Sequence, residues 1–377
     1  MFCYLHAPFC RSRCIYCDFY VTLDKYAGES GHTAFMDAAL HELALRVASL
    51  SSPLTCWESL YAGGGTPSLL KASHFDRLLG AMRAYASFSA RAELTLEINP
   101  DALGDEPRRY REVGFNRVSV GVQSFDDDLL RRLSRIHSAQ QAKDVIEALA
   151  ESGFDNISLD LMYALPGQSL DQWAQTLETA TTLPVTHLSA YGLKIEDGTP
   201  LARLAQTPRY AAPDDDLSAE MYAIAVDFLQ ARGFARYEIS NFARPGFESA
   251  HNRNYWRQGD WLALGPGACG SLGETRYETA RDLARWQAAP LTGALQAITP
   301  SEALENALIF GLRMGEGVSL PALAEKFGAT ALKTVLARLE PHRARGWLQE
   351  SDGRLTLAPQ AFALSNAILA DILPSDD

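Results

Sequence analysis

Three cysteines lie close together near the start of the 377-residue chain. Cys10, Cys14 and Cys17 have the spacing CxxxCxxC, and Arg11 and Arg13 stand between them. Cysteine thiolates bind iron–sulfur clusters, and neighbouring cations favour both the thiolate and an anionic cluster. Three thiolates can hold three irons of a cubane and leave the fourth iron free to chelate a small molecule. The spacing therefore predicts a [4Fe–4S] cluster with one open iron.

A zinc site is the alternative interpretation of these cysteines. Zinc usually takes four ligands, typically as paired CxxC or mixed Cys/His sets. Here a fourth ligand would have to come from Cys3, His6 or a distant residue. Cys3 and Cys56 are interpreted as small buried hydrophobic residues. Metal analysis distinguishes zinc from a cluster, and both remain open on spacing alone.

A glycine-rich loop at 63–67 reads Gly-Gly-Gly-Thr-Pro and includes Gly64, Gly65 and Thr66. Glycines let a backbone approach a ligand closely and expose its N–H groups. We expect this loop to receive polar groups of a small ligand, because it follows a strand candidate downstream of the cysteines. The alternative is a simple tight turn.

Four polar side chains stand in or just after other strand candidates or their connections: Glu97, Gln123, Arg135 and Asp160. Glu97 and Asp160 interrupt apolar runs, where an unpaired carboxylate is costly to bury. Gln123 offers an amide to a ligand, and Arg135 is suited to an acidic partner. Their shared position favours a common ligand. The alternative is an internal ion-pair network.

The elements that must position these residues alternate along the first half of the chain. Strands are expected at 2–6, 59–62, 94–98, 117–122, 157–162 and 187–193, and helices at 32–49, 72–86, 105–113, 139–152 and 170–183. This alternation predicts an α/β fold with a parallel sheet. Repeated βα units close into a barrel or partial barrel whose chemistry lies at the C-terminal ends of the strands. We expect a partial (β/α)6 TIM-like barrel.

The second half of the chain adds an extension and a small domain. A helix at 214–232, a strand at 234–240 and a Gly-rich stretch at 264–273 are expected before the pattern weakens at 288–300. We therefore place one domain at 1–290, with an extension at about 215–290, and a C-terminal domain at 291–377. Helices at 301–312, 320–327 and 330–345 and a hairpin at 347–357 indicate a winged-helix-like α+β domain.

Charge and hydropathy exclude some classes of function. The formal net charge is −12, which argues against a nucleic-acid-binding protein. No apolar run approaches the roughly 18 residues that span a bilayer. The N-terminal residues lack the basic and apolar regions of a signal peptide, so we expect the protein to be cytoplasmic.

The cysteine spacing and its flanks, from Tyr4 to Phe19, resemble the radical S-adenosylmethionine superfamily. Within it they resemble the coproporphyrinogen dehydrogenase-like branch, and most of all its HemW-type heme chaperones. The resemblance extends to about Gly270. It implies a radical SAM barrel whose cofactors are a [4Fe–4S] cluster and S-adenosylmethionine.

The resemblance also implies roles for individual residues. Residues matching family positions that contact S-adenosylmethionine, or aromatic positions near the cysteines, are Tyr4, Tyr16, Gly64, Gly65, Thr66, Glu97, Gln123, Arg135 and Asp160. Tyr4 matches a tyrosine six residues before the first cluster cysteine, and Tyr16 matches the aromatic residue before the third.

Two activities occur within this branch. The coproporphyrinogen III dehydrogenase carries out a radical oxidative decarboxylation, whereas the chaperone binds heme and delivers it to other proteins. The dehydrogenase has a fourth cysteine where this chain has Phe19, and a long N-terminal extension, whereas Cys10 is already the first ligand here. These differences favour the chaperone and imply that dehydrogenase activity is lacking, but the dehydrogenase remains the alternative.

A segment around residue 251 resembles the HNxxYW motif of the heme chaperones. His251 is suited to bind heme iron through a neutral imidazole, and Tyr255 and Trp256 offer flat apolar faces to a porphyrin. The alternative is that the aromatic residues pack a core and His251 is hydrogen-bonded. Cys269 stands where the family often has a histidine; its thiolate would also bind heme iron, or it has no such role.

The resemblance implies heme as a third cofactor, and heme-accepting proteins, such as respiratory proteins, as partners. It leaves open a peripheral association with membranes through those acceptors. It also leaves open whether S-adenosylmethionine is cleaved, and hence whether the protein is an enzyme.

Overall fold

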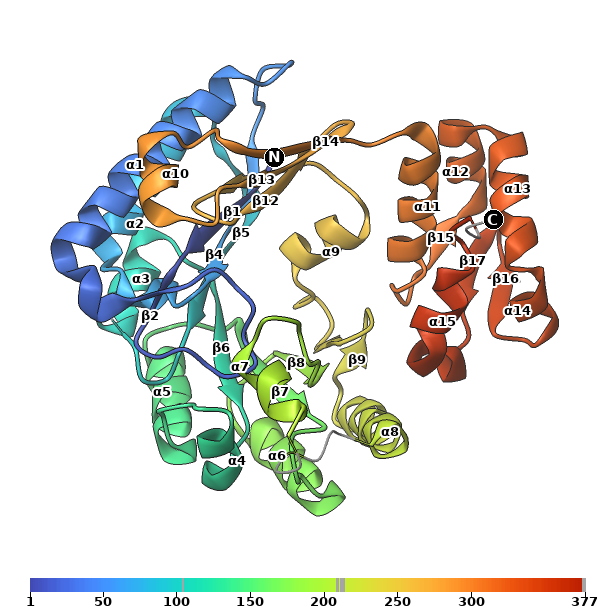
Figure 1. The fold of residues 1–377 in the computed structure, drawn as a ribbon, viewed down its shortest axis with the longest axis horizontal. Coiled ribbons are helices and arrows are strands. Elements are labelled where there is room, and N and C mark those ends of the chain that lie inside the picture. Colours follow the sequence, from blue (N-terminus) through green and yellow to red (C-terminus); the bar gives the residue numbers. More distant parts are fainter. Residues whose placement is uncertain (104, 208–209, 211–213, 375–377) are drawn as a thin grey trace.

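The expected βα alternation forms one large sheet in the computed structural model, which describes residues 1–103, 105–207, 210 and 214–374. Six strands pair in parallel in the order in which they occur along the chain: β1 (Phe2–Ala7), β4 (Trp57–Gly64), β5 (Phe88–Ile98), β6 (Arg117–Gln123), β7 (Ile157–Tyr163) and β8 (His187–Gly192). Each overlaps a predicted strand, so the parallel sheet of the predicted barrel is confirmed. Figure 1 shows how it curves.

Helices cover the outer face of this sheet (Figure 1). The expected ones are α1 (Gly28–Ala48), α2 (Ala72–Tyr85), α3 (Pro107–Val113), α5 (Ala139–Glu151), α6 (Leu170–Thr182) and α8 (Asp215–Ala231); α4 (Asp127–Arg132) and α7 (Pro200–Ala205) were not predicted. Their apolar faces bury large side chains such as Phe35, Phe75 and Trp173 against the sheet. This packing fixes where the strands end, and therefore where the site lies.

Both edges of the parallel sheet are extended. One edge gains β11 (Trp261–Leu264), parallel to β1, and then the antiparallel strands β12 (Cys269–Leu272), β13 (Thr275–Thr279) and β14 (Gly293–Ala297). The other edge gains β10 (Asn241–Ala243) and β9 (Ala235–Arg236). The strand predicted at 234–240 is wrong as one element, because the carboxylate of Glu238 accepts a hydrogen bond from the backbone of Ser240 and the chain turns there.

The C-terminal segment has its own hydrophobic core. It contains α11 (Pro300–Gly311), α12 (Leu320–Phe327), α13 (Ala329–Arg338), α14 (Glu340–Ala344), α15 (Ser365–Ala370) and a small sheet of β15 (Val318–Ser319), β16 (Leu348–Ser351) and β17 (Arg354–Leu357). The helix predicted at 330–345 is interrupted just before Pro341, as proline requires. Asp352 and Gly353 both have positive φ, which suits the predicted tight hairpin turn.

The predicted domain boundary at residue 290 lies before β14, yet β14 pairs with β13 in the large sheet. The structure therefore favours a division between Ala297 and Pro300. Within the described residues, none of the helices has both the length and the apolar character needed to cross a bilayer.

A buried carboxylate joins α1 to the extended edge of the sheet. Glu42 is fully buried; its Oε1 accepts hydrogen bonds from Arg46 at 2.9 and 2.7 Å. Its Oε2 accepts from the backbone N–H of Gly265 at 2.9 Å and from Nε1 of Trp286, in α10 (Leu283–Ala288), at 2.8 Å. One side chain thus satisfies buried donors from three segments.

We expect Glu42→Ala to lower the free energy of unfolding by about 3–5 kcal/mol, because it leaves the Arg46 charge and two N–H groups buried without an acceptor. Denaturant unfolding measures the change. Glu147→Ala, at an exposed position of α5, is the matched control and should change stability by less than about 0.5 kcal/mol. Equal effects of the two substitutions would contradict this role of Glu42.

Candidate functional site

The three clustered cysteines line one cavity at the C-terminal ends of the parallel strands. Cys10, Cys14 and Cys17 lie on the loop after β1, and the cavity that they line has a volume of about 510 Å³. This loop begins with β2 (Phe9–Cys10) and returns through β3 (Thr22–Leu23), which pairs with β2 in parallel. All six cysteines of the chain are free thiols. The structure therefore brings the three predicted ligands to one place.

The glycine loop holds the cysteine loop through backbone contacts. Gly65 N donates to Ala7 O at 2.8 Å, and Thr66 N donates to Phe9 O at 2.7 Å. A Cβ on Gly65 would lie 2.7 Å from the Phe9 carbonyl oxygen, so a side chain cannot be placed there. The N–H of Gly64 donates to Glu97 Oε2 at 3.1 Å.

The N–H groups of Gly64, Gly65 and Thr66 are therefore all used within the protein. That this loop receives polar groups of a ligand stays a prediction. The three residues nevertheless line the cavity. In the structure they position the cysteine loop, because their backbone hydrogen bonds hold it and the Thr66 hydroxyl lies 3.5 Å from Cys10 Sγ.

Two partly buried carboxyl groups line the cavity, Glu97 from β5 and Asp160 from β7. Glu97 accepts a hydrogen bond from the Tyr61 hydroxyl at 2.8 Å, and Asp160 accepts from Ser119 Oγ at 3.2 Å. Burial, reinforced by the charge of Asp160, raises the pKa of Glu97 to about 7. Burial also raises the pKa of Asp160. A cationic or hydrogen-bond-donating ligand would favour the ionised form of both groups.

Arg135 connects two of the cysteines through side chains. Its Nη1 lies 3.6 Å from Cys14 Sγ, and its Nη2 donates to Asn99 Oδ1 at 3.0 Å. Asn99 Nδ2 in turn donates at 2.7 Å to Thr66 Oγ1, which contacts Cys10. Among the described residues, Arg135 forms no ion pair with Glu97 or Asp160, so the alternative of an ion-pair network is not what the geometry shows.

Gln123 has an unusual backbone at the end of β6. Its φ is 68°, a conformation rare for a residue with a side chain, and the pairing between β6 and β7 shifts register between Gly121 and Gln123. Such bulges redirect side chains next to functional sites. Gln123 and Tyr16 both line the cavity.

The donor set fits an iron–sulfur cluster. Burial raises the pKa of Cys10 to about 12 and also raises that of Cys17, so the metal-free thiols are neutral and bound iron would be needed to hold them as thiolates. Among the described residues, no three or more His, Cys, Asp or Glu side chains are gathered as ligands of a single metal ion. A cubane requires a wider spacing, because each thiolate binds a different iron.

Tyr4 does not line the cavity. Its hydroxyl lies 3.1 Å from His6 Nδ1, and His6 Nε2 lies 2.8 Å from the carbonyl oxygen of Tyr20. This relay links β1 to the end of the cysteine loop. Tyr4 is therefore placed to position the cysteine loop, and its contact with S-adenosylmethionine stays a prediction.

His251 is enclosed at the start of α9 (Ala250–Trp256). It is 1% exposed; its Nδ1 lies 2.6 Å from Ser59 Oγ and its Nε2 lies 2.7 Å from the Tyr255 hydroxyl. Burial lowers the pKa of His251 to about 3, so the imidazole is neutral. Both nitrogens are occupied, and iron ligation would require one of these contacts to break.

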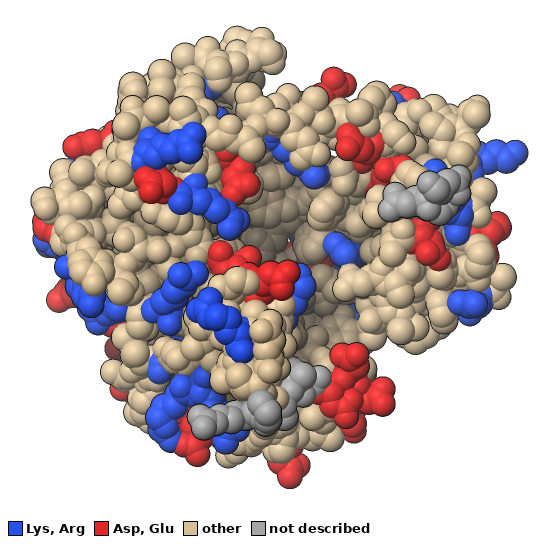
Figure 2. Space-filling view, in the orientation of Figure 1, with Lys and Arg blue, Asp and Glu red and all other residues tan. Residues whose placement is uncertain are grey.

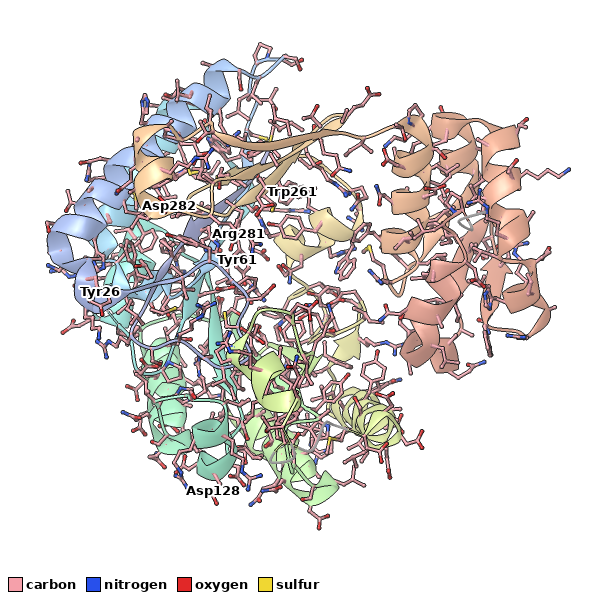
Figure 3. The ribbon with its side chains drawn as sticks, viewed as in Figure 1. Tyr26, Tyr61, Asp128, Trp261, Arg281 and Asp282 are labelled. Carbon is pink, nitrogen blue, oxygen red and sulfur yellow. The ribbon has the colours of Figure 1, made fainter. Side chains whose placement is uncertain are left out.

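Tyr255 contacts His251, but the other two expected heme residues, Trp256 and Cys269, do not converge with it. Trp256 packs toward the C-terminal domain, with its ring 5.9 Å from that of Phe310. Cys269 is exposed on β12, where its carbonyl accepts a hydrogen bond from Trp261 Nε1 at 2.7 Å. Trp261 also packs on Tyr255, so it links Cys269 to α9. Figure 3 labels Trp261 next to this helix.

Several residues of the cavity wall escaped the sequence analysis: Tyr61, Asn99, Arg117, Ser119, Ser189 and Tyr191. Asn99 follows Glu97 by two positions, so the alternation of strand side chains predicts that both face the same side. Arg117 begins a strand whose only other polar side chains are Ser119 and Gln123, so a charged residue there is also a sign of a site. Figure 2 shows charged side chains around the hollow between the sheet and the C-terminal domain.

Comparisons with known proteins agree with this architecture. Residues 4–180 match the radical SAM superfamily, and residues 298–364 match the HemN C-terminal domain. The heme chaperone HemW of Bacillus subtilis is 34% identical over 98% of each chain, and that of Escherichia coli is 37% identical over 74% of this chain and 71% of its own.

A solved structure shares the fold. The coproporphyrinogen III oxidase HemN of Escherichia coli, a radical SAM enzyme, superposes with a TM-score of 0.82 over 98% of this chain and 89% of its own, at 22% identity. The match to a curated relative at 34% identity over 98% of each chain shows membership of a family, and not only a shared fold. The chain belongs to the radical SAM superfamily and, within it, to the HemW family.

Proposed function

We propose that this protein is a heme chaperone that binds a [4Fe–4S] cluster through Cys10, Cys14 and Cys17 and S-adenosylmethionine at the open iron. The observation that supports the cluster is the gathering of these free thiols at one cavity. The curated relatives named heme chaperones support the chaperone function. When bound, the cluster would supply an iron that chelates the amino and carboxylate groups of S-adenosylmethionine.

The residues of the cavity would orient this ligand and balance its charge. The carboxylates of Glu97 and Asp160 would balance the positive charges on the sulfonium and amino groups of S-adenosylmethionine. The Gln123 amide would hydrogen-bond the nucleoside of the same ligand. Arg135, whose Nη1 lies 3.6 Å from Cys14 Sγ, would place a positive charge beside an anionic cluster. Gly64 to Thr66 would keep the cysteine loop in register with the strands.

Heme and its acceptors complete the proposal. We expect His251, Tyr255, Trp256 and Cys269 to contribute to a heme site, and heme-accepting respiratory proteins to be the partners, reached in the cytoplasm or at a membrane surface. Thiols remain reduced in the cytoplasm, as a thiolate-bound cluster requires. Since His251 is enclosed, heme binding would have to open its contacts with Ser59 or Tyr255.

We expect Cys10→Ser, Cys14→Ser and Cys17→Ser each to lose most of the iron and sulfide that anaerobic reconstitution introduces, because each removes one of three protein ligands. Iron and sulfide analysis with the visible absorption spectrum measures this. Cys56→Ser is the control, since Cys56 lies outside the cavity lining and contacts Glu58. Retention of the cluster in all three variants would refute the assigned ligands.

We expect S-adenosylmethionine affinity to rise with pH from about 6 to 8, because the pKa of Glu97 is raised to about 7 and only its ionised form attracts the sulfonium and amino groups. Glu97→Gln should bind about ten- to a hundredfold more weakly at pH 8 and show a flatter pH profile. Isothermal titration of reconstituted protein measures both, with Glu147→Gln as the control. A steep profile in Glu97→Gln would assign the titration to another group.

We expect purified protein to bind heme, His251→Ala to weaken binding, and Tyr255→Phe to bind at least as tightly as the natural protein, because the latter frees His251 Nε2. Heme titration followed by absorption measures this. Normal affinity of His251→Ala would remove His251 from the ligand set. Formation of protoporphyrinogen after anaerobic incubation of the same preparation with coproporphyrinogen III would favour the dehydrogenase instead.

A further inference from the structure

A buried arginine lies at the far end of the cavity from the cysteines. Arg117 is the first residue of β6 and 1% exposed, and it lines the same cavity as Cys10. Gln123, at the other end of β6, is about 20 Å away along the strand at roughly 3.3 Å per residue. The cavity thus runs along the strand interior, with a cation at the end opposite the cluster ligands.

The guanidinium of Arg117 lacks partners on two of its nitrogens. Nε and Nη1 are buried, and no described residue forms a hydrogen bond with either. His187 and His251 are neutral. Burial lowers the pKa of each imidazole well below its usual value, and the positive charge of Arg117 lowers it further. The ring nitrogens of His187 contact Ser158 and Tyr237.

The nearby carboxylates are already engaged with other donors. Glu93 makes the largest charge contribution to Arg117, but its oxygens accept hydrogen bonds from Ser249 Oγ and from the backbone N–H groups of Ala250 and His251, at 2.9–3.0 Å. Glu93 therefore serves the start of α9. Asp160 and Glu97, the other acids of the cavity, accept hydrogen bonds from Ser119 and from Tyr61 and Gly64.

A buried guanidinium with unused donors is costly, and an anion that completes its hydrogen bonds offsets that cost. A carboxylate suits it better than a phosphate, because the cavity already holds Glu97 and Asp160 and a second negative charge on the ligand would be repelled. The carboxylate of S-adenosylmethionine is expected at the opposite end, beside the cysteines.

We propose that Arg117 binds a carboxylate of a second ligand that enters the barrel alongside S-adenosylmethionine. This inference rests on the proposed function, under which that ligand is heme and the carboxylate is one of its propionates. Arg117 then favours ligands that carry a free carboxylate. The start of α9, which Glu93 holds through hydrogen bonds, lies next to the site.

The test compares heme with its dimethyl ester, which lacks both acidic groups, in titrations of the full-length, cluster-reconstituted protein. We expect the natural protein to bind heme about ten- to a hundredfold more tightly than the ester, as for loss of a hydrogen bond between charged groups. Arg117→Gln should lose this preference by weakening heme alone, and Arg117→Lys should retain part of it. Arg91→Gln, at an exposed position of β5, is the control.

The preference is a ratio, so it is insensitive to the fraction of a variant that folds, and the heme–ester comparison in the natural protein needs no substitution at all. S-adenosylmethionine affinity, measured in parallel at pH 8, should fall far less than heme affinity in Arg117→Gln, because Arg117 is the smallest of the causes that set the pKa of Glu97. Equal affinity for heme and ester, an unaltered preference in Arg117→Gln, or loss of S-adenosylmethionine binding alone would overturn the inference while leaving the chaperone proposal in place. Failure of the natural protein to bind heme at all would refute both.

Discussion

The close approach of two loop backbones is the constraint on which the rest of the site depends. Gly65 and Thr66 donate their N–H groups to Ala7 and Phe9, and the absence of a side chain at Gly65 allows the contact. This places Cys10 beside the Thr66 hydroxyl and over the C-terminal ends of β1 and β4. A substitution that separated the loops would displace the cysteine loop without touching a cysteine.

Around this contact the sheet interior balances buried charges in two groups. Near the cysteines, Arg135 reaches Cys14 and Asn99, which in turn reaches Thr66. At the far end Arg117 lies among neutral histidines. Because these groups are buried or partly buried, their charges interact more strongly than they would in water, and each ligand that enters would change the protonation of its neighbours. Two ligands sharing this cavity would therefore be coupled electrostatically.

The sequence predicted the parts of the fold that have strong local patterns. The apolar runs of β6 and β7 and the helical periods of α5 and α6 are visible without a partner. The short edge strands β12 to β14 were missed, because their stability comes from pairing with a sheet formed elsewhere. Among site residues, clustered cysteines and acids in apolar strands stood out. The enclosure of His251 did not, since its partner Ser59 is 192 residues away in the chain.

The central claim is that Cys10, Cys14 and Cys17 bind three irons of a [4Fe–4S] cluster and leave the fourth iron open for S-adenosylmethionine. Low-temperature electron paramagnetic resonance of the reduced, reconstituted protein, before and after S-adenosylmethionine is added, tests it most directly. A cluster signal that shifts on addition, and that is unchanged by an analogue lacking the amino and carboxylate groups, is the predicted result. A signal identical in both states, or the absence of any cluster signal, would contradict the account.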